Sequence, residues 1–92
     1  MNRVIEKKAL SQYFNHVLNG DKTFELRLAD WKCEQGDTLV LREVDKSGNY
    51  TGRELRKKVG FVLKTKDLEL FPKEDVDEYG YQVISLLDGV KK

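Results

Sequence analysis

The sequence is poor in the residues that most small catalytic and metal sites need. Its 92 residues include one cysteine, Cys33, and one histidine, His16. A single cysteine excludes a disulfide within the chain and a zinc site built from several cysteines. A lone histidine also argues against most other zinc sites, Ser-His-Asp chemistry and Cys-His pairs. We therefore expect no metal site and no cofactor, and we interpret Cys33 as a small neutral side chain.

Long apolar runs are missing as well. No stretch is long enough to span a bilayer, and residues 1–4 lack the apolar core of a secretory signal. These absences favour a cytoplasmic protein with no membrane contact. The length fits a single domain, residues 1–92 with a core at about 4–87, and leaves no room for a second. We expect this domain to be a monomer.

A large excess of one sign of charge is also absent, since the net charge is only +1. The distribution is less even. Residues 1–66 hold 14 basic and 9 acidic side chains, a balance of +5, and residues 67–92 hold 3 basic and 7 acidic, a balance of −4. A dipolar molecule of this kind fits docking of a phosphate backbone on one face, although an ordinary solvated surface has the same composition.

Apolar periodicity and turn residues divide the chain into short elements. An amphipathic helix is expected over residues 11–19, before Gly20, because one apolar stripe recurs at helical spacing: Leu10, Tyr13, Phe14, Val17 and Leu18. A short helix should follow Pro72, and Lys91 and Lys92 are typical of a frayed tail. Strands are expected over residues 3–8, 23–28, 38–44, 50–63 and 81–87, with a hairpin turn at 45–49.

Alternation along two of the strands predicts which side chains are buried. In residues 23–28 we expect Phe24, Leu26 and Leu28 to face the core, and Thr23, Glu25 and Arg27 to face solvent. In the long return arm, Gly60 suits a bulge or close packing. There the residues of shared parity, expected on the buried face, are Leu55, Val59, Phe61 and Leu63.

The order of elements is strand, helix, three strands, short helix, strand. The β-α-β-α repeat of a parallel sheet is missing. We therefore predict an α+β fold with a small, mostly antiparallel sheet that curls into a barrel. One amphipathic helix follows the first strand and a short helix precedes the last.

The most informative surface segment is residues 19–27, where a helix end meets a strand. Lys22 lies near the turn, and Glu25 and Arg27 share one face of the strand. A cation, a carboxylate and a guanidinium that converge in this way are suited to bind a phosphate or the polar edge of a base. The alternative is an ion pair on a sheet surface, which contributes little.

The segment Gly20-Asp21-Lys22-Thr23-Phe24-Glu25-Leu26-Arg27 is one of several landmarks that occur in a recognisable order. The others are Tyr13-Phe14, Gly36-Asp37 before an apolar strand, Tyr50-Thr51-Gly52-Arg53-Glu54, and Gly80-Tyr81-Gln82-Val83-Ile84. In this the chain resembles the ASCH (activating-signal-cointegrator homology) family, over about residues 4–87. The likeness is to its short bacterial and phage members of unassigned function.

The resemblance implies a PUA-like β-barrel with a helix closing a cleft, and RNA or a nucleotide as the partner in that cleft. The family motif, carried over by position, places Gly20, Lys22, Glu25 and Arg27 along the cleft, with Thr23 between them.

An enzymatic alternative comes from ASCH relatives that hydrolyse acetylated cytidine. These are similar in having a lysine, a threonine nucleophile three places on and a later glutamate. Here Lys22 matches, but Glu25 stands where the threonine is expected and Thr23 is displaced. If the protein is an enzyme, the catalytic candidates are Lys22 and Glu25, with Glu25 as a general base. No later glutamate stands out, since Glu69, Glu74 and Glu78 lie in an acidic irregular segment.

Other basic and aromatic residues extend the binding hypothesis. A phosphate-binding track is suggested by basic residues near the helix, Lys7 and Lys8, and on the hairpin arm, Arg53, Arg56, Lys57 and Lys58. Basic residues on exposed strands also discourage aggregation. Tyr50 at the hairpin is a candidate for stacking on a base. A protein-interaction module without nucleic acid is a third alternative.

Overall fold

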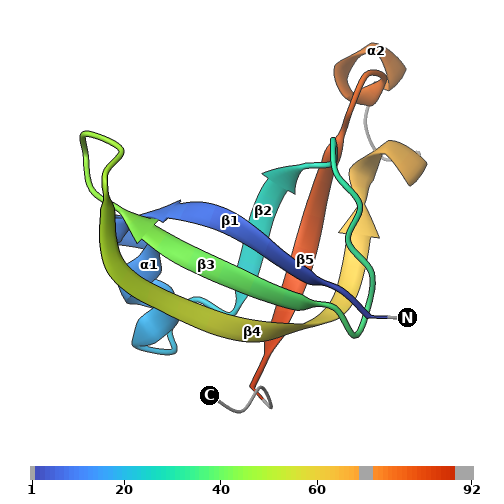
Figure 1. Ribbon diagram of the computed structural model, residues 1–92. Coiled ribbons are helices and arrows are strands. Elements are labelled where there is room, and N and C mark those ends of the chain that lie inside the picture. Colours follow the sequence, from blue (N-terminus) through green and yellow to red (C-terminus); the bar gives the residue numbers. More distant parts are fainter. Residues whose placement is uncertain (1, 69–71, 89–92) are drawn as a thin grey trace.

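The computed structural model describes residues 2–68 and 72–88. Five strands form one mixed sheet in the order β1-β3-β4-β5-β2, which curls into a half-barrel (Figure 1). This confirms the predicted α+β fold, with a helix after the first strand and a short helix before the last. The elements are β1 (Val4–Leu10), α1 (Ser11–Leu18), β2 (Phe24–Leu28), β3 (Thr38–Val44), β4 (Tyr50–Lys64), η1 (Thr65–Asp67), α2 (Lys73–Val76) and β5 (Tyr81–Leu87).

The sheet is antiparallel except at one edge. β1 runs parallel to β3, and the pairs β3–β4, β4–β5 and β5–β2 are antiparallel. The long strand β4 pairs with β3 through its first half and with β5 through its second, so it carries the bend of the sheet. β1 and β2 are left as the two edges.

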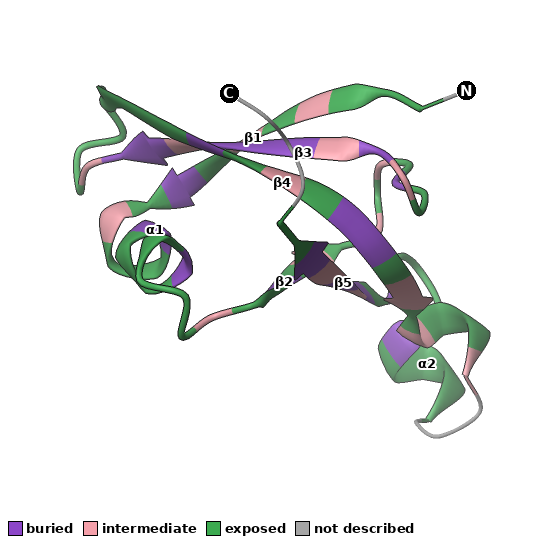
Figure 2. Ribbon diagram, turned by 90° about the horizontal axis from the view of Figure 1, so that it is seen from below, coloured by how far each residue is buried: buried purple, intermediate pink, exposed green. Residues whose placement is uncertain are grey.

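The core lies between the concave side of the sheet and α1 (Figure 2). From the helix, Phe14 and Val17 are buried, whereas Tyr13 and Leu18 of the same predicted stripe stay about half exposed. The helix itself is therefore confirmed, but its apolar stripe is only partly used for the core. The strands contribute the remaining core residues Ala9, Leu39, Leu41, Leu55, Val59, Ile84 and Leu86, together with Cys33 from a loop.

The predicted orientation of β2 is wrong, although the strand and its alternation are confirmed. Glu25 is only 4% exposed, whereas Phe24 and Leu26 are 49% and 59% exposed. Glu25 pairs with the core residue Ile84 of β5, so the carboxylate lies on the inner face of the sheet, and Phe24, Leu26 and the 47% exposed Leu28 lie on the outer face. Burial of the Glu25 carboxylate is tolerated since two cations donate to it.

The predicted burial of Phe61 is also wrong. The register of β4 against β5 shifts between Val59 and Val62, which confirms the bulge expected at Gly60. A Cβ on Gly60 would lie 3.2 Å from the Ser85 Cβ, so the strands approach closely there. The extra residue reverses the alternation, and Val62 rather than Phe61 packs against the core while Phe61 is 65% exposed.

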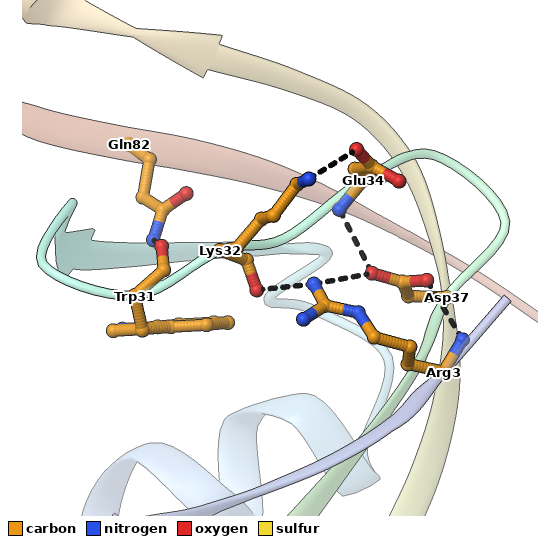
Figure 3. A network of polar contacts seen from close by, with 6 residues as sticks. All are labelled: Arg3, Trp31, Lys32, Glu34, Asp37 and Gln82. Carbon is orange, nitrogen blue, oxygen red and sulfur yellow. Dashed lines mark hydrogen bonds and ion pairs between the residues drawn. The ribbon is translucent and has the colours of Figure 1, made fainter.

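A buried carboxylate fastens the loop between β2 and β3 to the start of β1 (Figure 3). Asp37 is fully buried, with Oδ1 accepting from the Arg3 amide at 2.9 Å and Oδ2 from the Glu34 amide at 2.9 Å. The Arg3 guanidinium donates to Asp37 Oδ2 and to the carbonyl of Lys32. Burial raises the pKa of Asp37, but these hydrogen bonds outweigh it and lower the pKa below its ordinary value.

The loop held in this way also buries Cys33. Burial is the main cause that raises the pKa of its thiol, so the expectation of a neutral side chain is confirmed. Within residues 2–68 and 72–88 no helix is long and apolar enough to cross a membrane. The frayed tail predicted at Lys91 and Lys92 lies outside the described residues, and so does Glu69.

Candidate ligand-binding site

The site is built on the turn that joins α1 to β2. The helix ends at Leu18, and Gly20 takes a left-handed backbone with φ of +85°. The amides of Asp21 and Lys22 then both donate to the carbonyl of His16, at 3.2 and 3.1 Å. This tight reversal places Lys22 immediately before the edge strand that carries Glu25 and Arg27.

Glu25 lies between two cations. Its Oε1 accepts from Lys22 Nζ at 2.9 Å, and its Oε2 accepts from Arg27 Nε at 2.8 Å. The Lys22 and Arg27 side chains are themselves mostly covered, at 17% and 25% exposure. The predicted convergence of these three side chains is therefore present, but it is partly buried and not a surface pair.

An open pocket of about 450 Å³ adjoins this group. It lies where the end of β1, the start of α1 and β2 meet. The pocket combines one carboxylate, three cations and an apolar wall, and its lining residues are Lys8, Ala9, Leu10, Tyr13, Lys22, Phe24, Glu25, Leu26 and Arg27.

The pocket bridges the two edges of the half-barrel. Arg27 Nη2, on edge strand β2, donates to the carbonyl of Lys8, on edge strand β1, at 2.9 Å. Arg27 therefore donates from Nη2 across the seam, by which we mean the gap between the edge strands β1 and β2, and from Nε to Glu25. In the described part of the chain no group accepts from Nη1, which leaves that nitrogen available to a ligand.

The electrostatics of the pocket favour a ligand with negative or electron-rich groups. Lys8, Lys22 and Arg27 supply three positive charges against the single negative charge of Glu25. Lys22 Nζ also donates to the carbonyl of Phe24 at 2.7 Å and lies 4.8 Å from the centre of its ring. Phe24 and Tyr13 line the pocket and are each about half exposed, and aromatic side chains of this kind are suited to stacking against a planar group.

The residues predicted to form the site divide into two groups. Lys8, Lys22, Glu25 and Arg27 line the pocket. Gly20 shapes the preceding turn, and no atom other than those of its neighbours in the chain lies within 4 Å of a Cβ built there. Thr23 is exposed and outside the lining, with its carbonyl accepting from the Leu86 amide.

Tyr50 and Arg53 lie away from this pocket. Tyr50 lines a second pocket on the other side of Lys8. Arg53 instead holds the buried Glu43, with Nε 2.8 Å from Oε1 and Nη2 2.8 Å from Oε2. The Thr51 hydroxyl donates to the same carboxylate at 2.6 Å. Hydrogen bonding from Arg53, and then from Thr51, lowers the pKa of Glu43 to about 2.

Several pocket residues were not recognised in the sequence. Leu10 ends β1 and Tyr13 lies on the predicted apolar stripe of α1, whereas Phe24 and Leu26 lie on the strand face that the alternation predicts to be buried. The apolar stripe has more residues than one short helix can bury, and in α1 only Phe14 and Val17 are buried. This excess of apolar residues was the signal for an exposed apolar wall. Ala9, also in the lining, has no sequence feature that marks it.

A domain family matches nearly all of this architecture. The family described as a domain of unknown function, DUF3850, matches residues 5–84, and the chain belongs to it. The match covers β1 except its first residue, the pocket segment and the first part of β5.

Among curated proteins, the chain is similar to an uncharacterized 12.9 kDa protein in the GpA 3′ region of Escherichia phage P2. The two are 37% identical over 67 residues, which is 73% of this chain. The matched segment spans 61% of the phage protein.

Proposed function

We propose that this protein binds RNA or a nucleotide in the pocket beside Lys22, Glu25 and Arg27. The observation that carries the proposal is the geometry of these three side chains. They form a polar group with spare hydrogen-bonding capacity at an open pocket whose other wall is aromatic and apolar. Nucleotides present the same combination of a planar ring, polar edges and a phosphate.

The parts of the pocket correspond to parts of such a ligand. Tyr13 and Phe24 offer ring surface for stacking a base. The carboxylate of Glu25 is an acceptor for an exocyclic amino group, and the free Nη1 of Arg27 is a donor for a base carbonyl or a phosphate oxygen. Lys8 is exposed at the rim and is suited to a phosphate.

The same residues support placing the chain among ASCH domains with a PUA-like barrel. The support is the spacing of Gly20, Lys22, Glu25 and Arg27, together with a helix packed on a curled sheet beside them. On this proposal the seam between β1 and β2 is the cleft in which such domains hold their ligand.

Binding without turnover is favoured over hydrolysis of an acetylated nucleoside. Thr23 lies outside the pocket lining, and Glu25 occupies the place where the related hydrolases have their nucleophile. Glu74 and Glu78 are exposed. We expect no release of acetate from acetylated cytidine, and measurable turnover that is lost in Glu25→Gln would replace binding with catalysis as the function.

The direct test is the affinity of the protein for a panel of short single-stranded RNAs and nucleotides. Lys22→Gln and Arg27→Gln should each weaken binding by about tenfold or more, because each removes a charged donor. Affinity should fall with salt, with a slope in log–log coordinates of about −2 if three phosphate contacts form.

A matched control is available for the lysine. Lys57 is an ion-paired lysine of similar burial, 2.6 Å from Asp88 with 20% of its side chain exposed, and it lines neither pocket. Lys57→Gln should leave the affinity unchanged. Equal loss in Lys57→Gln and Lys22→Gln would show a general charge effect, and unchanged affinity in Lys22→Gln and Arg27→Gln would refute the assigned site.

A further inference from the structure

A second pocket of about 370 Å³ lies against the outer side of β1. It is lined by Glu6, Lys7, Lys8, Arg42 and Tyr50. The strand register accounts for this grouping, because Lys8 on β1 pairs with Arg42 on β3, and Tyr50 on β4 pairs with Val44 two residues further along β3. Three strands thus bring two cations and an aromatic ring to one place.

The cations and the ring are arranged as a platform. Arg42 Cζ lies 4.1 Å from the centre of the Tyr50 ring, and Lys8 Nζ lies 5.6 Å from it. The ring is about half exposed. Lys7 also lines the pocket, but its ammonium lies 4.2 Å from the ring of Trp31 and is occupied there. A stacked arginine and tyrosine present a planar surface with positive charge at its edge.

These charges are only loosely compensated. Arg42 Nη1 is 3.6 Å from Glu6 Oε1, near the limit of an ion pair, and both side chains are well exposed. Such a pair contributes little to stability and leaves the arginine free to turn toward a ligand. The second pocket therefore differs from the Glu43–Arg53 pair, in which a short bidentate contact fixes the guanidinium.

Lys8 is the residue that connects the two pockets. It lines both of them, its carbonyl accepts from Arg27 on one side, and its ammonium approaches Tyr50 on the other. A ligand that occupies both pockets must pass over Lys8. A phosphodiester between two nucleosides has its negative charge at that point.

We infer that the two pockets form one track for two neighbouring nucleotides of a single-stranded RNA. One base lies in the pocket beside Glu25, the linking phosphate is held by Lys8 and Arg42, and the next base stacks on the Arg42–Tyr50 platform. This inference rests on the proposed nucleotide binding, and it makes a dinucleotide unit the smallest complete ligand instead of a free nucleoside.

The test compares ligands of increasing length by NMR titration. The probes are the four nucleosides, their 3′- and 5′-monophosphates, and the four homodinucleotides. Wild-type protein should gain affinity from nucleoside to one of the two monophosphates, which gives the strand polarity, and again by about tenfold from that monophosphate to the dinucleotide.

Two variants locate the gain. Tyr50→Leu should remove the step from monophosphate to dinucleotide and leave the monophosphate affinity unchanged. Arg42→Gln should weaken both the monophosphate and the dinucleotide but not the nucleoside. The control is Arg56→Gln, since Arg56 is similarly exposed, faces Glu54 at 3.5 Å and lines neither pocket; it should change none of these values.

The outcomes separate the two proposals. If Arg27→Gln weakens nucleoside binding while Tyr50→Leu and Arg42→Gln leave the dinucleotide affinity at the wild-type value, the second pocket is not part of the track and the proposed function stands. If no probe binds, or if Arg27→Gln has no effect on any of them, the proposed function fails and the track fails with it.

Discussion

Two buried glutamates with arginine partners lie in different surroundings in this molecule. Glu25 and Glu43 are almost equally inaccessible, at 4% and 3% exposure, and each has both carboxylate oxygens occupied. Glu25 lines the 450 Å³ pocket at the open seam between β1 and β2. Glu43 lines neither pocket and is enclosed by the β3–β4 hairpin and the Arg53 side chain.

The difference lies in what surrounds each arginine. Arg53 uses Nε and Nη2 on Glu43 and extends Nη2 to Asn15 Oδ1, so it ties the hairpin to α1. Arg27 likewise uses Nε and Nη2 within the protein, but its side chain lines an open pocket together with a second cation, Lys22. Burial and ion pairing alone therefore do not identify a ligand site. What distinguishes Arg27 from Arg53 is the pocket that it lines with Lys8 and Lys22.

The largest expected contrast is between the two arginines. Arg53→Gln should lower the thermal midpoint clearly, because it removes the bidentate, charged donor from the buried Glu43 carboxylate. It should not change RNA affinity when measured below the transition. Arg27→Gln should reduce RNA affinity by about tenfold or more with a smaller loss of stability. Calorimetry and RNA titration of both variants measure this, and a binding defect in folded Arg53→Gln would restore Arg53 as a contact residue.

A smaller effect is expected from acid. The pKa of Glu43 is about 2 in the folded protein, below its ordinary value of 4.5, so the charged form is favoured by folding. Its contribution to stability is complete above about pH 4.5 and is lost as the pH falls toward 2. Protonation of Glu43 should raise the equilibrium constant for unfolding by about tenfold. This is less than the lowered pKa alone implies, because Arg53 is half exposed and solvent screens the ion pair.

Denaturant titrations between pH 6 and pH 2 provide the measurement. The pKa of Asp37 is also lowered, so its contribution to the stability of the fold is likewise lost as the pH falls. Wild type must therefore be compared with the Glu43→Gln variant, in which only the Glu43 contribution is missing. That variant should have a shallower dependence on pH than wild type. Parallel curves for the two proteins would contradict the role assigned to Glu43.

The smallest expected effect tests whether Glu25 only positions its cations or also contacts the ligand. Glu25→Gln keeps the shape but removes the charge that Lys22 and Arg27 now neutralise. If Glu25 only positions them, inorganic phosphate should bind a few times more tightly, because two cations are released. A loss confined to bases that carry an exocyclic amino group would instead show that the carboxylate reads the base. Titrations with phosphate and with cytosine- and uracil-containing nucleotides separate the two results.

Local patterns predicted most of the elements but not which side of each strand is buried. The hairpin turn, the strand at residues 38–44 and the bulge at Gly60 follow from turn chemistry and from alternation. The same alternation along β2 is compatible with either face inward, and its apolar residues suggested the wrong one. The orientation is seen only in the register with β5, where Glu25 lies opposite the core residue Ile84 and is neutralised by Lys22 and Arg27.

The site was predictable to the extent that it is local. Lys22, Glu25 and Arg27 lie within six residues, so a turn and a strand suffice to bring them together. Lys8 joins them through contacts between the two sheet edges, which no short-range pattern encodes. The burial of Glu43 has no local signal either, because its partners Thr51 and Arg53 meet it only across the folded hairpin.

The parallel pairing of β1 with β3 has a consequence for the order in which the chain assembles. The β3–β4 hairpin joins residues that are close in sequence, whereas β1 must close a loop of more than thirty residues to pair Val4 with Thr38. In pulse-labelling hydrogen exchange, the amides of β3 and β4 should therefore become protected before those of β1. Since Lys8 belongs to β1, the ligand pocket should be completed only in the last stage of folding.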